Sequence, residues 1–133
     1  MKSLLVLALV AGVQTLAAQA DPRGKILTDL GCSDCHTIVA LRVKSKADVG
    51  PDLSAAYVDV PFRYGMPLER FFDQPPSIMR IVLGGRTDLT RAQRDSLIAL
   101  FRTLYTEQIA KLDSAQRRVR PVGAGDPRSR IQR

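Results

Sequence analysis

The stretch CSDCH, residues 32–36, decides how this sequence is interpreted. It contains both cysteines of the 133-residue chain, Cys32 and Cys35, and its only histidine, His36. Two thiols and an imidazole placed this close together bind metals, form disulfides or attach a prosthetic group. The rest of the sequence has to distinguish these three kinds of chemistry.

Two of the three interpretations leave something unexplained. A structural zinc site takes four protein ligands, so the fourth would have to be a carboxylate or come from another chain. A redox disulfide suits an oxidising compartment, but that class of protein has a strand before the motif and a βαβ pattern, and neither is visible. The disulfide interpretation also leaves His36 without a role.

The third interpretation uses every residue of the motif, because C-x-x-C-H is the attachment sequence for c-type haem. Cys32 and Cys35 would form thioethers with the two vinyl groups, since their spacing on a helical turn brings both sulfurs to one edge of the porphyrin. His36 would then give a nitrogen to the iron. The sequence therefore predicts one covalently bound haem c.

The N-terminal segment predicts export from the cytoplasm. Lys2 precedes an apolar run over residues 4–16, and Ala18-Gln19-Ala20 has the small residues of a cleavage site. We expect a signal peptide over residues 1–20, a domain over 21–115 in the periplasm, and no transmembrane span in the mature chain. The alternative is an uncleaved anchor, but the run is short for a membrane span.

The positive charge is concentrated near the C-terminus. The chain has a net charge of +7, and residues 111–133 contain seven basic and two acidic residues, a net of +5. We expect residues 116–133 to be a basic, disordered tail that contacts an acidic partner or a membrane surface, or is simply solvated. Because the body is nearly neutral and shows no RNA- or DNA-reading motif, no nucleic-acid partner is expected.

The apolar pattern predicts helices at both ends of the domain and no sheet. Asp21-Pro22 is typical of a helix start, and the residues that follow place their apolar side chains on one face. Thr90 and Gln93 have the spacing of a capping box. The three- and four-residue steps after them predict a long helix over residues 90–115.

The middle of the chain shows weaker signals. A short helix is expected from Pro67 to Phe72, ended by Pro75 and Pro76. Residues 37–65 are expected to be mostly loop, because the stretch lacks sustained periodicity and contains two glycines and two prolines. Two or three helices would form a thin core for this length, so a bulky apolar group would help to fill it.

With these segments in place, the chain resembles the small mono-haem class I cytochromes c over residues 22–106. The resemblance implies an all-α fold in which N- and C-terminal helices cross around one covalently bound haem c. It also implies that Gly24 lets the first helix approach Phe101 of the last. Its matched segments are Gly24-Lys25-Ile26-Leu27 with the CSDCH motif, Gly50-Pro51-Asp52-Leu53, and residues 97–104.

The resemblance also implies roles for individual residues. The carbonyl of Pro51 would accept a hydrogen bond from Nδ1 of His36, which fixes the nitrogen that faces iron. The second axial ligand would be a methionine, Met79 or alternatively Met66. Met79 lies eleven residues before Thr90 and Met66 twenty-four, and the family's ligand precedes the last helix closely. Arg80 departs from the proline that usually follows this ligand.

Candidate partners for the haem propionates lie between the two ligand segments: Tyr57, Arg63 and Tyr64. The family often has a tryptophan here, and this chain has none. Arg63 is equally well interpreted as a solvated surface charge.

The expected function is one-electron transfer to and from transient redox partner proteins in a respiratory chain. The chain is not expected to be an enzyme, because no second histidine or acid–base constellation accompanies the motif. Residues 59–65, together with the later Pro-Pro-Ser-Ile-Met segment (75–79), resemble mono-haem cytochromes that accompany periplasmic nitrous oxide reductases, which implies a donor to a periplasmic reductase. The alternatives are a haem-based sensor or small-ligand binder with a labile sixth site, and a haem subunit of a larger redox complex.

Overall fold

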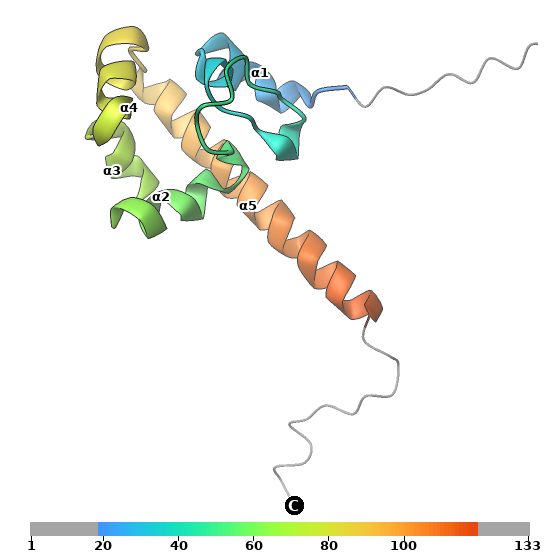
Figure 1. The fold of residues 1–133 in the computed structure, drawn as a ribbon. Coiled ribbons are helices and arrows are strands. Elements are labelled where there is room, and N and C mark those ends of the chain that lie inside the picture. The colour runs from blue at the N-terminus through green and yellow to red at the C-terminus, as the bar shows by residue number, and fades with distance from the viewer. Residues whose placement is uncertain (1–18, 120–133) are drawn as a thin grey trace, which may run out of the picture.

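The structure, a computed structural model, describes residues 19–119. The predicted signal peptide falls outside this range apart from its last two residues, as do residues 120–133 of the predicted tail. Within it the chain is a mostly helical small domain with five α-helices and no strands, so the prediction of a helical domain without a sheet is confirmed (Figure 1). None of the described helices is both long and apolar enough to cross a membrane.

The N-terminal helix begins where the sequence predicts. A 3-10 turn, η1 (Pro22–Gly24), leads into α1 (Lys25–Asp29). The Asp21 carboxylate accepts a hydrogen bond from the Arg23 N–H at 2.9 Å, as expected of a cap. Gly31, at φ 75°, then turns the chain into the motif, and this conformation strongly favours glycine.

The prediction of loop over most of residues 37–65 is wrong for its second half. A turn η4 (Leu53–Ala55) runs directly into α2 (Ala56–Tyr64), which contains Pro61. The proline removes one helical hydrogen bond, yet the helix persists because the turn η4 that leads into it is capped and one face of α2 is buried. The Asp52 carboxylate accepts from the N–H of Ser54 at 2.9 Å, and Ala56 and Val60 are buried.

The next part of the chain contains one predicted and two unpredicted elements. The short helix expected after Pro67 is α3 (Leu68–Asp73), and it ends before the two prolines as predicted. They are followed by α4 (Ser77–Ile81) and by η5 (Val82–Arg86), a turn of π-helix. Neither α4 nor η5 is indicated by a local pattern in the sequence.

The last helix is α5 (Arg91–Val119), and it extends four residues past its predicted end. Its capping box is present: the Thr90 N–H donates to Oε1 of Gln93 at 2.9 Å, and the Gln93 N–H donates to Oγ1 of Thr90 at 3.3 Å. Figure 1 shows α5 crossing the whole body and continuing beyond it.

One buried cluster joins the two ends of the domain. Leu27 of α1 shares it with Leu97, Phe101 and Leu104 of α5, and all four are at most 3% exposed. The prediction that Gly24 allows a close approach to Phe101 is wrong. A Cβ at Gly24 would lie 2.5 Å from Cγ2 of Val43, and the other nearest atoms belong to Leu41.

Ion pairing adds a second link between the two ends of the domain, since Arg23 donates to Glu107 of α5 at 2.7 Å.

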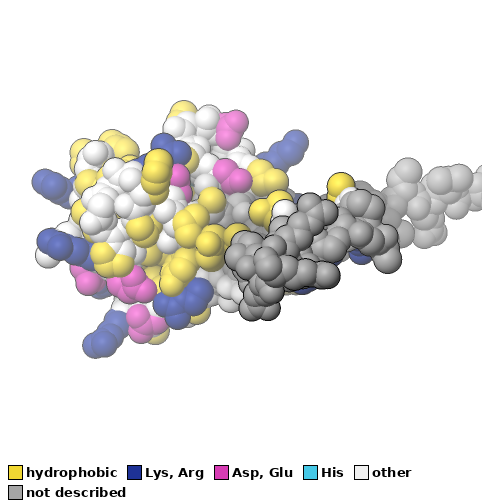
Figure 2. All heavy atoms as spheres, turned by 90° about the horizontal axis from the view of Figure 1, so that it is seen from below, with side chains coloured by type: hydrophobic (Ala, Val, Ile, Leu, Met, Phe, Trp, Pro, Cys, Tyr) yellow, Lys and Arg dark blue, Asp and Glu magenta, His cyan; other side chains and the backbone are white. Residues whose placement is uncertain are grey.

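The core does not cover all apolar side chains. On the face seen from below, apolar side chains gather in a patch over the middle of the body (Figure 2).

Candidate functional site

The motif forms a single tight turn. Cys32 begins η2 (Cys32–Asp34), and the N–H groups of Cys35 and His36 both donate to the Cys32 carbonyl, at 3.3 and 3.0 Å. Both cysteines are free thiols and half-buried. The turn therefore presents two unpaired sulfurs and the imidazole from one short segment.

The His36 ring is held by one hydrogen bond. Its Nδ1 lies 2.8 Å from the carbonyl oxygen of Pro51, the contact that the resemblance implies. A carbonyl only accepts, so Nδ1 donates its proton and Nε2 carries the free lone pair. No hydrogen bond to Nε2 occurs within residues 19–119, so the lone pair is available to a metal.

Gly50 leaves room for this arrangement. Its N–H donates to the Cys35 carbonyl at 2.8 Å, which brings its backbone against the imidazole. A Cβ on Gly50 would overlap two atoms of the His36 ring, and a third, Cγ, would be 2.9 Å away. The sequence Gly-Pro thus supplies both the space and the carbonyl that fix the ring.

We expect Gly50→Ala to destabilise the protein by about 1–3 kcal/mol, because the new methyl group must displace the His36 ring or the Pro51 carbonyl. Chemical denaturation measures this change. Gly84→Ala in η5 is the control, since a Cβ there meets nothing within 4 Å. Equal stability of the Gly50→Ala and wild-type proteins would show that the ring is not held as described.

The Cys32 thiol is poorly suited to disulfide exchange. Burial raises the pKa of the Cys32 thiol to about 11, so almost none of it is thiolate at neutral pH. Reactive C-x-x-C pairs have a lowered thiol pKa instead. This observation argues against the redox-disulfide interpretation.

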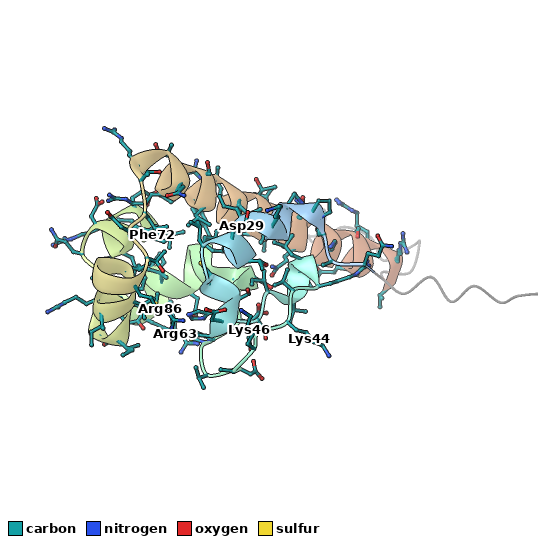
Figure 3. All side chains as sticks on the ribbon, turned by 90° about the horizontal axis from the view of Figure 1, so that it is seen from above. Asp29, Lys44, Lys46, Arg63, Phe72 and Arg86 are labelled. Atoms are coloured by element: carbon teal, nitrogen blue, oxygen red, sulfur yellow. The ribbon has the colours of Figure 1, made fainter. Side chains whose placement is uncertain are left out.

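Asp34, within the motif, connects it to two other segments. Its carboxylate pairs with Lys46 at 2.7 Å and with Arg86 of η5 at 3.4 Å. The hydrogen bond from Lys46 lowers the pKa of Asp34. Lys46 and Arg86 lie on the same side of the ribbon in Figure 3. The Arg86 pair links the turn to η5, and the Lys46 pair links it to the loop that follows the motif. No local signal in the sequence indicates either pair.

The two candidate methionines lie in different parts of the fold. Met66 precedes α3 and Met79 lies in α4, and both are half-buried and pack against the core cluster, as does Cys32. No residue of α4 or η5 is buried, although these elements are rich in apolar side chains. Ile78 and Ile81, which flank Met79, are 66% and 69% exposed.

The three residues proposed to contact propionates have partners within the protein. The Tyr57 hydroxyl accepts from Nε of Arg102 at 3.1 Å, and Arg63 donates to Asp59 at 2.6 Å. Tyr64 packs against the Phe71 ring at 5.4 Å between centroids. Tyr57 therefore points to α5, and Arg63 is an exposed, ion-paired surface residue.

Other kinds of site are less consistent with the described residues. Residues 19–119 contain no group of three or more His, Cys, Asp or Glu side chains placed to hold a metal ion, which argues against structural zinc. Two half-open surface hollows, of about 330 and 290 Å³, are lined by residues of α3, α4, α5 and the η5 region and by none of the motif.

The residues of this site are compatible in type with a covalently attached haem. It would use both free thiols and the free Nε2, and its apolar ring would cover apolar side chains that the chain itself leaves exposed. Comparisons with protein-family models, with curated proteins and with solved structures found no match. The functional assignment therefore depends on the site alone.

Proposed function

We propose that this chain is an exported mono-haem c-type cytochrome with the small cytochrome c fold, acting as a one-electron carrier in a respiratory chain. One observation carries the proposal: the CSDCH turn presents two free thiols beside a histidine whose Nδ1 is fixed by the Pro51 carbonyl at 2.8 Å. That arrangement leaves Nε2 ready to bind iron.

Each residue of the site has a defined task in this proposal. Cys32 and Cys35 tether the haem, and the carbonyl of Pro51 keeps His36 in the tautomer that binds metal. Met79 would supply a sulfur ligand to the iron. When bound, haem supplies reversible one-electron Fe(II)/Fe(III) chemistry.

This chemistry needs no catalytic acid or base from the chain, so we do not propose an enzyme. Transient redox proteins would be the partners, a periplasmic reductase among them.

A haem-based sensor or small-ligand binder is the second candidate. The observation that favours it is the placement of Met79 on α4, which has no buried residue. A ligand on so weakly anchored a helix can leave the iron. The ferric spectrum distinguishes the two: a low-spin spectrum with the long-wavelength band of an iron–methionine bond supports the carrier, and a high-spin spectrum supports the binder.

Attachment is tested on the exported protein produced with a haem-maturation system. We expect the haem to remain on the polypeptide in denaturant and to resist extraction by acidified acetone, because two thioethers hold it. Intact mass spectrometry should show one added haem. Complete extraction of the haem, or a mass without it, would overturn the proposal.

A further inference from the structure

The carboxylate of Asp34 joins three segments of the chain at one point. Its Oδ1 lies 2.7 Å from Nζ of Lys46, and its Oδ2 lies 3.4 Å from Nη2 of Arg86 in η5. Asp34 stands two residues before His36, and Arg86 follows Met79 by seven residues. One side chain therefore connects the two segments that would carry the axial ligands.

The segment that contains Met79 is weakly held by the core. Residues 77–87, here called the Met79 segment, comprise α4, η5 and Thr87, and none of them is buried. Met79 and Leu83, both half-buried, are its members that pack against the core cluster. Figure 1 shows α4 at the periphery of the body. A segment with so little buried surface opens more readily than the core does.

The backbone of the Met79 segment does not favour a fixed helix either. Ser77 has φ 54°, a left-handed conformation that is unfavourable for a residue with a side chain. Gly84 and Gly85 lie in η5, and glycine is a poor helix former. A Cβ on either glycine would meet nothing within 4 Å, so packing within the described chain does not require them. The segment therefore needs an anchor from outside itself.

Two side-chain contacts supply that anchor, and both lead to the motif turn. Among residues 19–119, only Arg86 and Thr87 link the Met79 segment to a distant part of the chain by hydrogen bonds or ion pairs. Arg86 donates to Asp34 at 3.4 Å. The Thr87 hydroxyl donates to the carbonyl of Leu30, also at 3.4 Å. The loop around Lys46 differs, because its backbone N–H groups donate to two carbonyls of the motif turn, both at 3.0 Å.

We propose that Asp34 and Arg86 form a latch that holds the Met79 segment against the motif and so positions Met79 as the second axial ligand. Its role for Met79 rests on the proposed function, since it would govern how readily the methionine leaves the iron. The pair is exposed, with 72% of the Arg86 side chain accessible, so its contribution is modest. It matters here because little else restrains the segment.

The test compares Arg86→Gln with wild type in haem-loaded protein. Hydrogen exchange followed by mass spectrometry reports how often residues 77–86 open. Titration of the ferric protein with imidazole reports how readily an outside ligand takes the sixth site. We expect the exchange rate of this segment and the apparent imidazole affinity both to rise about threefold at low salt, as loss of an exposed ion pair allows. The difference should shrink at high salt, which screens the pair in wild type.

Three further variants separate a latch from a merely structural effect. Arg86→Lys keeps the charge and should retain most of the wild-type behaviour. Asp34→Asn should match Arg86→Gln, and the double variant should add little to either, because both changes remove the same pair. Lys46→Gln is the matched control, since it removes a partner of the same carboxylate on another segment. It should leave both measurements unchanged.

Several results would overturn the proposal. Wild-type exchange and imidazole affinity in Arg86→Gln would overturn the latch, as would an equal effect of Lys46→Gln. Faster exchange without a change in imidazole affinity would overturn the positioning of Met79. Failure of the proposed function is distinguishable, because it would appear as purified protein without covalent haem. The role of Met79 would then be overturned, and hydrogen exchange alone would decide whether Asp34 and Arg86 hold the segment.

Discussion

Replacing Cys32 and Cys35 together by alanine is expected to remove covalently attached haem completely. Thioethers to Cys32 and Cys35 would be the only covalent links of this kind, since the chain has no other cysteine. His36 would still bind iron, but a haem held by axial ligands alone leaves in denaturant. Intact mass spectrometry and extraction with acidified acetone measure the loss.

The double variant should still fold. Cys32 is half-buried at the edge of the core, and removing its sulfur costs only about 1 kcal/mol. Circular dichroism of the haem-free protein checks that the helices remain. Each single variant keeps one thiol and is the control: it should retain covalent haem at reduced yield.

Two outcomes would contradict the haem interpretation. One is a double variant that carries as much covalent haem as wild type. The other is a wild-type protein that carries none and forms a Cys32–Cys35 disulfide on oxidation, which would restore the redox interpretation despite the raised pKa of the Cys32 thiol.

Local signals in the sequence predicted several elements well. The caps at Asp21 and Thr90 depend on side chains that bond backbone groups a few residues away, so they can be read without a structure. The end of α3 before Pro75 has the same local origin. The contact between His36 and Pro51 was implied only by the resemblance, because fifteen residues separate the two.

Features that depend on tertiary contacts were missed or misplaced. Pro61 and two flanking glycines concealed α2, which continues directly from the Asp52-capped turn η4 and buries Val60. The close neighbour of Gly24 is Val43, which lies on a loop that no periodic pattern places. The pairs of Asp34 with Lys46 and Arg86 join segments far apart in sequence, and charge alone does not select partners.

Met79 and Met66 are the two candidates for the second axial ligand of the proposed haem. Position in the chain favours Met79, and α4 adds an apolar surface that no residue of the described chain covers. Met66 packs against the same core cluster from the start of α3. A haem between His36 and α4 would explain why Ile78 and Ile81 are exposed, whereas a ligand at Met66 would leave them unexplained.

Met79→Ala is therefore expected to convert a six-coordinate, low-spin haem to a high-spin or hydroxide-bound one. Loss of the sulfur should lower the midpoint potential by on the order of 100 mV or more, a fraction of the roughly 0.8 V that axial ligation spans. Spectroscopy and potentiometric titration measure both changes. The fold should survive, because Met79 is only half-buried on a helix without buried residues.

Met66→Ala is the matched control, since it removes the same side chain from the same cluster. We expect an unchanged spectrum and potential with a loss of stability of up to about 2 kcal/mol, as for a methionine that fills part of a core. The opposite pair of results would assign the ligand to Met66. If neither variant changed the spectrum, the sixth site would not be a methionine, and the small-ligand binder would replace the electron carrier as the better proposal.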